Sequence, residues 1–248
     1  MEVPPEVIDM MRDVRSVAVL TGAGISAESG IVTFRGKNGL WEKFQPDEVA
    51  TPAAWKKDPL KVWNFHHGLL QAISENEPNQ AHRTLAEMEK HYRDFSVITQ
   101  NIDQYHQDAG SKNVLELHGN AWRMKCTKEG TISTDYSLPK KELPPKCKCG
   151  ALLRPDVVWF NEPLQADVVE RAFTLARECQ VMLVIGTSAY VQPAALLPAV
   201  AHESGADVVE FNLEPTAHSY LATYSFFGKA GETLPVFWKA VKAHHYKN

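Results

Sequence analysis

Long hydrophobic runs are missing from this sequence, and no stretch approaches the roughly 18 apolar residues that a membrane-spanning helix requires. The N-terminal segment MEVPPEVIDMMRDV is acidic and contains prolines, so it lacks the basic start and apolar stretch of a signal peptide. Internal repeats and low-complexity tracts are absent as well. We therefore expect a soluble, cytoplasmic protein with no membrane partner.

A large excess of charge of one sign is also missing. The 248 residues carry a net charge of −4, and 44% of them are hydrophobic. This balance argues against general nucleic-acid binding and is compatible with substrates that carry basic segments. The apolar content is sufficient for one large domain or for two domains of unequal size.

Cysteine is scarce, and its distribution is informative. Of four cysteines, Cys126, Cys147 and Cys149 fall in one stretch, whereas Cys179 stands apart. In a cytoplasmic chain such a cluster favours metal binding over a disulfide. The surrounding segment 122–156 is rich in lysine and proline and lacks apolar periodicity, so it predicts a small metal ribbon without a sheet.

Five short apolar segments alternate with helical patterns, and each is followed by polar or glycine-rich residues. They are 17–20, 95–99, 114–117, 181–185 and 208–211. Strands that alternate with helices predict a parallel, doubly wound sheet. Ligands bind beyond the carboxyl ends of the strands in such sheets, so the five polar ends are the expected lining of a site.

The segment VAVLTGAGISAESG, residues 17–30, predicts a buried strand, a tight turn and a helix that begins at Ile25. Gly22, Gly24 and Ala27 fit the G-x-G-x-x-G/A spacing of a dinucleotide pyrophosphate site. Free N–H groups at the start of the helix would point at an anion. Alone, this motif is equally compatible with a plain glycine-rich turn, and it would also allow a dehydrogenase.

A series of further motifs follows in order: TFRG, GLW, TQNID, LHG, LLRPDVVWF, GTSAYVQPAA and NLEP. Together with GAGISAESGI they resemble the sirtuin family of NAD-dependent protein deacylases over nearly the whole chain. The resemblance implies an α/β fold, in which a Rossmann-like doubly wound parallel sheet carries a smaller inserted domain. The NAD-binding domain would comprise residues 1–30, 77–121 and 157–248. The small domain would comprise 31–76, a helical module, and 122–156, a degenerate zinc ribbon.

The resemblance also implies a reaction. The carbonyl oxygen of an acyl-lysine in a substrate protein attacks the anomeric carbon of the nicotinamide ribose, nicotinamide leaves, and lysine and 2′-O-acyl-ADP-ribose are released. His118 is the implied base, for which a pKa near working pH is suitable, and Asn101 positions a water and the ribose. Taken alone, His118 would be structural, and Asn101 and Asp103 would be helix caps.

Binding roles follow from the same resemblance. NAD contacts are implied for Gly22, Ala23, Gly24, Ile25, Thr33, Phe34, Arg35, Gln100, Asn101, Asp103, Gly186, Thr187, Ser188, Asn212, Glu214 and Ala230. The acyl-lysine peptide is expected to contact His66, Leu69, Val158, Phe160, Asn161 and Val191. Without the motif context, the apolar members of this second set would be ordinary core residues.

The sequence departs from the family pattern in its metal ligands. Glu129 stands where the second sulfur of a C-x-x-C pair is usual, and Cys147 and Cys149 are one residue closer than in that pair. Structural zinc normally has four ligands, and only Cys126, Cys147 and Cys149 are obvious ones. Zinc binding and a domain held by packing alone both remain open.

Two departures concern the substrate. Family members that remove succinyl or malonyl groups carry Tyr-x-x-Arg, where this chain has His66 and Leu69. No fixed cation is then expected for an acidic acyl group, so we predict a preference for acetyl and other uncharged acyl groups. Gly68 beside Leu69 is consistent with longer chains.

Asn161 replaces a glycine in the loop that pairs with the substrate backbone, and Val32 replaces a common proline. Asparagine tolerates a positive φ, but weakened peptide binding would favour a mono-ADP-ribosyltransferase or an NAD-cleaving enzyme. A third alternative is a non-catalytic NAD-binding or metal-ribbon module, although such a module has no need of His118, Asn101 and Asp103 together.

Overall fold

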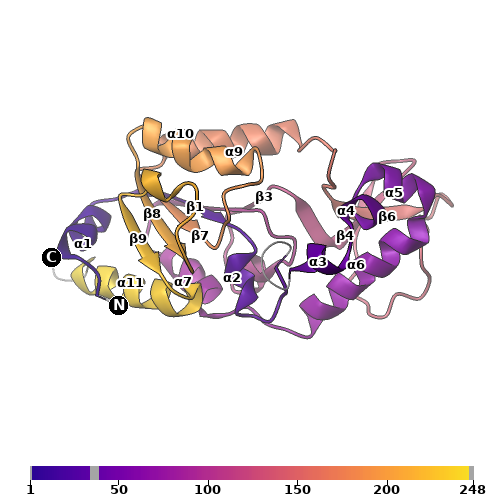
Figure 1. Cartoon of the computed structure of the whole chain (residues 1–248), viewed down its shortest axis with the longest axis horizontal. Helices are drawn as coiled ribbons and strands as arrows, with labels where there is room; N and C mark the ends of the chain where they lie inside the picture. Colours follow the sequence, from indigo (N-terminus) through magenta and orange to yellow (C-terminus); the bar gives the residue numbers. More distant parts are fainter. Residues whose placement is uncertain (1, 34–38, 246–248) are drawn as a thin grey trace.

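A six-stranded sheet forms the larger part of the molecule in the computed structural model, which describes residues 2–33 and 39–245, except the side chain of residue 245. All neighbouring strands are parallel, in the order β3-β2-β1-β7-β8-β9 (Figure 1). The strands are β1 (Ser16–Thr21), β2 (Asp94–Thr99), β3 (Val114–Glu116), β7 (Val181–Ile185), β8 (Asp207–Asn212) and β9 (Tyr224–Phe227). Starting from β1, the chain therefore adds strands toward one edge of the sheet up to β3, and toward the opposite edge from β7 to β9.

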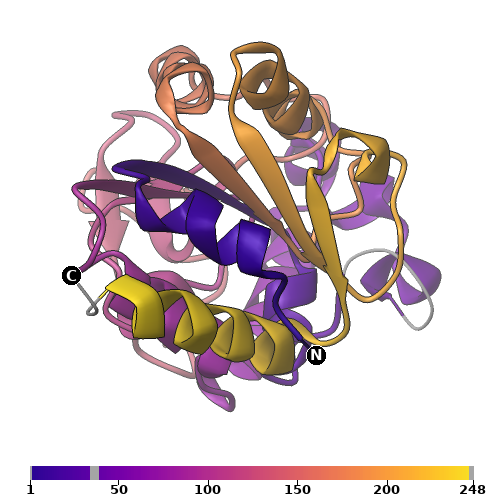
Figure 2. The same ribbon diagram turned by 90° about the vertical axis from the view of Figure 1, so that its left-hand side faces the viewer.

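Helices cover both faces of this sheet, so β1 is buried on both sides. Val17 and Val19 pack in one core, and Ala18 and Leu20 pack in the other. The first core lies under α1 (Pro5–Arg12), α7 (Gln80–Met88) and α11 (Ala230–His245), and the second lies under α9 (Ala166–Glu178) and α10 (Leu197–Glu203) (Figure 2). The predicted doubly wound parallel sheet is confirmed.

A second, smaller sheet lies beside the first. It is antiparallel, in the order β5-β4-β6, and consists of β4 (Gly119–Cys126), β5 (Ile132–Thr134) and β6 (Leu153–Val157). The expectation that residues 122–156 contain no sheet was therefore wrong. The pattern was hidden because β6, with the sequence LRPDV, mixes charged residues with proline.

Four helices pack with the small sheet: α3 (Leu40–Lys43), α4 (Pro46–Val49), α5 (Pro52–Lys57) and α6 (Pro59–Ser74). Asp58 caps α6 by accepting a hydrogen bond from the backbone N–H of Lys61. The fully buried Trp63 of α6 donates its indole N–H to the carbonyl of Leu153 in β6 at 2.8 Å. This helical part and the small sheet thus form the predicted smaller module, whereas the residue bounds given above for the two domains stay a prediction.

The connection between the two sheets passes through His118 and Gly119. Gly119 has a φ of +81°, and a Cβ there would lie 2.2 Å from the carbonyl oxygen of Asp156. Only glycine permits this close approach of β4 to β6. His118 is therefore held at the junction of the parallel sheet and the small module. No helix within the described residues is long and apolar enough to span a membrane.

Candidate active site

The glycine turn after β1 packs directly on the turn after β7. The backbone N–H of Gly24 donates to the carbonyl of Gly186 at 2.8 Å, at the start of α2 (Gly24–Ala27). A Cβ on Gly22 or on Gly24 would come within 2.8 or 2.7 Å of Gly186. The predicted turn is present, and its glycines are required by this backbone contact between two strand ends.

A buried hydrogen-bonded set lies beside this turn. Asn101 donates from Nδ2 to the carbonyl of Gly22 and to Oγ of Ser26, both at 3.1 Å. Ser26 donates to Oδ2 of Asp103 at 2.7 Å, and the backbone N–H of Tyr105 donates to Oδ1 at 2.9 Å. Burial raises the pKa of Asp103, and these hydrogen bonds oppose that shift. The set thus places the side-chain amide of Asn101 and the carboxyl group of Asp103 just beyond the end of β2.

Two histidines, His82 and His106, lie next to this hydrogen-bonded set, and no role was predicted for them from the sequence. His82 accepts at Nδ1 from the backbone N–H of Asn79, as part of a capping box at the start of α7. Its Nε2 therefore carries the hydrogen and faces Oγ of Ser26 at 3.4 Å. His106, in α8 (Tyr105–Asp108), has Nε2 3.0 Å from Oγ1 of Thr21.

Both rings are neutral at physiological pH. Burial lowers the pKa of His82 to about 2 and that of His106 to about 3. Because Ser26 gives its own hydrogen to Asp103, the Nε2–H of His82 points at a free lone pair of the serine oxygen. The sequence offered no signal for this arrangement, since the interacting residues are far apart in the chain.

His118 is oriented by a main-chain contact. Its Nδ1 lies 2.9 Å from the carbonyl oxygen of Gln100. A carbonyl only accepts, so Nδ1 carries the hydrogen and the lone pair is on Nε2. Burial lowers the pKa of His118 and the bond to Gln100 opposes that shift. A neutral imidazole with an available Nε2 is the form that a general base needs.

Other predicted NAD contacts gather around the same strand ends. Gln100 donates to Oγ1 of Thr187 at 3.2 Å, and Asn212 donates to the carbonyl of Thr187 at 2.9 Å. Ser188, which follows Thr187, and Glu214, two residues after Asn212, are exposed. Ile25 and Ala230 are instead buried in the core under α7 and α11, where they pack rather than face solvent.

Thr33 lies in the described chain, where its carbonyl accepts from the backbone N–H of Leu40 at 2.9 Å. The predictions for Phe34 and Arg35 lie outside the described residues.

A cavity of about 580 Å³ opens from the buried set toward α6. Its polar end includes Ser26, Asn101 and Asp103, with Ala23 beside them. Its apolar end includes Ile31, Val32, Leu40, Phe44, Phe65, Gly68, Leu69, Ala72 and Ile73, and the lining also contains Lys43, Gln45, Glu48, Lys61 and Asn64. A Cβ on Gly68 would meet nothing within 4 Å. Of the predicted site residues, Ala23, Leu69, Asn101 and Asp103 line this cavity.

His66 faces away from the lining that the described residues form. Its Nε2 lies 2.9 Å from the carbonyl oxygen of Ala121, and its ring packs edge-on against Trp63 with centroids 5.4 Å apart. Burial lowers the pKa of His66 to about 4. The substrate contact predicted for His66 stays a prediction, and the contacts described here give the ring a structural role between α6 and β4.

The loop after β6 contains three of the predicted peptide contacts. The backbone N–H of Val158 donates to the carbonyl of His118 at 2.9 Å, and that of Phe160 donates to Ala50 at 3.0 Å. Asn161 has a φ of 65°, so asparagine adopts the left-handed conformation that glycine would take. Arg154 pairs with Glu162, and this ion pair closes the loop.

Comparison with known proteins identifies the fold family. The sequence profile described as "Sir2 family" matches residues 22–193. The chain belongs to the Sir2 family. It is 51% identical over 220 residues to a protein of Aquifex aeolicus named NAD-dependent protein deacylase, covering 88% of this chain and 92% of that one. A protein of Pyrococcus furiosus with the same name is 53% identical over 221 residues, which cover 87% and 88% of the two chains.

Solved Sir2 structures match almost the whole chain. A crystal structure of a Sir2 homologue with NAD has a TM-score of 0.92 and 42% identity, covering 98% of this chain and 96% of that chain. A Sir2 complex with a p53 peptide and NAD+ has a TM-score of 0.86 and 33% identity, covering 98% and 100% of the two chains.

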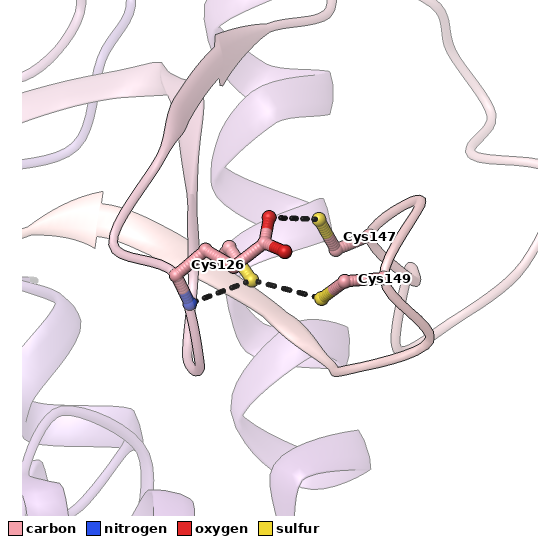
Figure 3. Close-up of side chains that lie close together, drawn as sticks. Cys126, Cys147 and Cys149 are labelled. Carbon is pink, nitrogen blue, oxygen red and sulfur yellow. Dashed lines mark hydrogen bonds between the residues drawn. The ribbon is translucent and has the colours of Figure 1, made fainter.

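The cysteines of this Sir2 chain meet as predicted, and a fourth group joins them (Figure 3). The ligand atoms of Cys126, Glu129, Cys147 and Cys149 all lie within 4.8 Å of one another. The Sγ atoms of Cys126 and Cys149 are 3.6 Å apart, too far for a disulfide, and the cysteines are free. Four such donors fit structural zinc.

Proposed function

We propose that this chain is an NAD-dependent protein-lysine deacylase. The observation that carries the proposal is the orientation of His118, whose Nε2 lone pair is available because Nδ1 is bound to the carbonyl of Gln100. A neutral base bound to the main chain of Gln100, the residue before the buried Asn101, suits a reaction at the nicotinamide ribose. The names of the relatives and the NAD complexes of Sir2 homologues support the same activity.

The strand ends would hold NAD at its phosphates and riboses. Backbone N–H groups at the Gly22–Gly24 turn suit the pyrophosphate. Gln100 and Asn212 carry amides that suit the two riboses, and Thr187 lies between them. Asp103 offers a carboxylate that accepts the carboxamide N–H of nicotinamide, with its second oxygen held by Ser26. These roles are ours, inferred from position and donor type.

The proposed reaction consumes NAD. The acyl-lysine carbonyl oxygen forms a bond to the anomeric carbon while the bond to nicotinamide breaks. This step gives an alkylamidate. His118 then takes the proton of a ribose hydroxyl at Nε2, and the resulting alkoxide attacks the amidate carbon. The bond from that carbon to the lysine nitrogen breaks, and the amine leaves with the proton that His118 returns. Water then adds to the same carbon while its bond to the anomeric oxygen breaks, which gives 2′-O-acyl-ADP-ribose. We assign to Asn101 the positioning of that water and of the ribose.

The cavity supports a preference for uncharged acyl groups, including chains longer than acetyl. Phe65, Gly68 and Leu69 lie in its apolar end, where a methylene leaves water on binding. Each buried methylene contributes about 0.8 kcal/mol, or about fourfold in kcat/KM if the gain persists in the transition state. Lys61 also lines the cavity but is paired with Glu48 at 2.7 Å, and Lys43 is exposed at the rim.

The ADP-ribosyltransferase alternative depended on damage to the peptide-binding loop at Asn161. That loop keeps a φ of 65° at Asn161 and retains the Arg154–Glu162 ion pair. No feature of the described residues favours the alternative.

Product analysis tests the proposed function. Purified protein is incubated with NAD and peptides that carry lysine, acetyl-lysine, hexanoyl-lysine or succinyl-lysine. We expect nicotinamide release only with acylated peptides, with one 2′-O-acyl-ADP-ribose formed for each nicotinamide, and faster turnover of hexanoyl than of succinyl peptide. Nicotinamide release that does not depend on acyl-lysine would contradict deacylation, and faster desuccinylation would contradict only the acyl preference.

A further inference from the structure

We propose that Glu129 supplies the fourth ligand of a tetrahedral metal site, so that zinc is held by three thiolates and one carboxylate oxygen. The inference concerns this chain in particular, because its sequence places a carboxylate where a fourth sulfur would complete two cysteine pairs. It does not depend on the proposed enzymatic activity.

The four ligand atoms lie within 4.8 Å of one another, and two of their separations are close to those of a tetrahedral zinc site. Zinc lies about 2.3 Å from sulfur and about 2.0 to 2.2 Å from a carboxylate oxygen, so tetrahedral ligand atoms are about 3.5 to 3.8 Å apart. The Sγ atoms of Cys126 and Cys149 are 3.6 Å apart, and Oε2 of Glu129 is 3.9 Å from Sγ of Cys147. A rearrangement of the backbone is therefore not needed to bind the ion.

Two tight turns bring the ligands together. In the turn after β4, the N–H of Gly130 donates to the carbonyl of Cys126 at 3.0 Å, and the N–H of Glu129 points at Sγ of Cys126 at 3.3 Å. In the facing turn, Gly150 donates to the carbonyl of Cys147 at 2.9 Å. The first turn directs the Glu129 side chain toward the second, so the carboxylate meets the thiols across the gap.

The chemistry of the four groups favours a cation. Three thiolates and one carboxylate would repel one another without a counterion, whereas a divalent ion leaves the same net charge of −2 that four thiolates would leave. Soft thiolates select zinc over magnesium or calcium, and a carboxylate is an accepted zinc ligand. The oxygen is a harder ligand than the sulfur it replaces, so we expect weaker zinc binding than a fourth thiolate would give.

The site would join the β4–β5 turn to the segment that precedes β6. β6 continues into Val158, whose N–H binds the carbonyl of His118. Metal at one end of β6 would thus fix a strand whose other end leads into the predicted peptide contacts and is hydrogen-bonded to the main chain of the proposed base.

The test uses the full-length protein and three variants: Glu129→Gln, Glu129→Cys and, as the matched control, Glu142→Gln. Glu142 is an acidic residue of the same segment, and it pairs with Lys146 at 2.9 Å instead of with the cysteines. Zinc content is measured after dialysis, zinc affinity by competition with a chromophoric chelator, and the ligand set by the absorption spectrum of the cobalt-substituted protein.

We expect one zinc in the wild type and in Glu142→Gln. Glu129→Gln should bind zinc more than about 100-fold more weakly, because loss of a group outside the ligand shell costs only about 10- to 100-fold. Glu129→Cys should bind it more tightly and should change the cobalt spectrum toward that of four sulfur ligands. Should Glu129→Gln fail to fold, the comparison of Glu129→Cys with wild type decides. Substoichiometric zinc in the wild type, or identical spectra and affinities in wild type and both Glu129 variants, would overturn the proposal.

Discussion

Ser26 donates its hydroxyl hydrogen to Oδ2 of Asp103 at 2.7 Å, and both side chains are buried at the polar end of the cavity. The other carboxylate oxygen is held by the N–H of Tyr105. Asp103 is therefore fixed in orientation by two donors from different elements, and it is one of the residues that line the cavity. The relationship makes Ser26 a positioning residue for the proposed carboxamide contact.

Replacing Ser26 by alanine should weaken NAD binding more than it slows chemistry. A hydrogen bond to a charged group contributes about 1.5 to 3 kcal/mol, which corresponds to about 10- to 100-fold in KM for NAD. Steady-state kinetics with saturating acetyl peptide would measure this change. Ser74→Ala, at an exposed position in α6, is the matched control. An unchanged KM for NAD in Ser26→Ala would contradict the assigned role.

Replacing His118 by alanine should abolish deacylation and leave NAD binding intact. The imidazole is the proposed base, and its ring is bonded to the main chain of Gln100 rather than to the Gly22–Gly24 turn proposed to bind the phosphates. Turnover by mass spectrometry of the peptide and NAD affinity by calorimetry would separate the two effects. Persistent turnover in His118→Ala would show that another group is the base.

The activity should extend to a lower pH than an ordinary histidine base allows. Burial lowers the pKa of His118 below its usual value of 6.5, so more of the ring is neutral at that pH than in an ordinary histidine. We expect the acidic fall of kcat/KM, which follows the protonation of His118, to have its midpoint below pH 6.5. A pH profile of kcat/KM measures this, because it reports groups of the free enzyme. A midpoint above 6.5 would be contrary to this expectation.

Three buried histidines should make the folded state sensitive to mild acid. Burial lowers the pKa of His66 to about 4, that of His82 to about 2 and that of His106 to about 3. Their stability contribution is complete above pH 6.5, where both states are neutral, and is lost as pH falls because the unfolded chain gains protons first. The slope for each histidine rises toward a limit of about 1.4 kcal/mol per pH unit as the pH falls below 6.5.

Denaturant unfolding between pH 7 and pH 5 would measure that loss. His66→Gln keeps a donor for the carbonyl of Ala121 and removes one titrating group, so the mean slope over this range should fall by about 1 kcal/mol per pH unit. A slope equal to that of the wild type would show that His66 is not neutral in the folded protein.

Filling the apolar end of the cavity should shorten the acyl chains that are accepted. A leucine at Gly68 would extend into space that is open beyond 4 Å. If it displaces two methylenes of an octanoyl group, about 1.6 kcal/mol of binding free energy is lost. The ratio of octanoyl to acetyl kcat/KM should then fall about tenfold or more. Gln71→Leu adds the same side chain at an exposed position of α6 and should not change this ratio. Equal ratios in Gly68→Leu and Gln71→Leu would place the acyl chain elsewhere.

Strong local patterns made the large sheet predictable. The segment 181–185 matches β7 in full, because five consecutive apolar residues flanked by polar ones leave little choice of bounds. β9, with the sequence YSFF, was missed because two of its residues are only half-buried and one is exposed. In β6, pairing with β4 and the burial of Pro155 and Asp156 outweigh the polar composition.

The site residues were predictable where one sequence motif contains both the functional side chain and the strand end that positions it. His118, Asn101 and Asp103 stand at strand ends, so topology brings them to one edge of the sheet. Ser26 and His82 were not found, because their roles depend on contacts between segments more than 50 residues apart. Glu129 has an unusual spacing, and only the facing turns show that its carboxylate reaches the cysteines.

The contact of Gly22 and Gly24 with Gly186 has a consequence for how this protein can change. The two turns come from opposite halves of the chain, and no side chain separates them. A substitution at any of the three cannot be rescued by one compensating change, because backbone occupies the space on both sides. Random libraries should therefore retain glycine at these positions even under selection for a new substrate. Gly68, where a side chain would enter open space, should accept other residues.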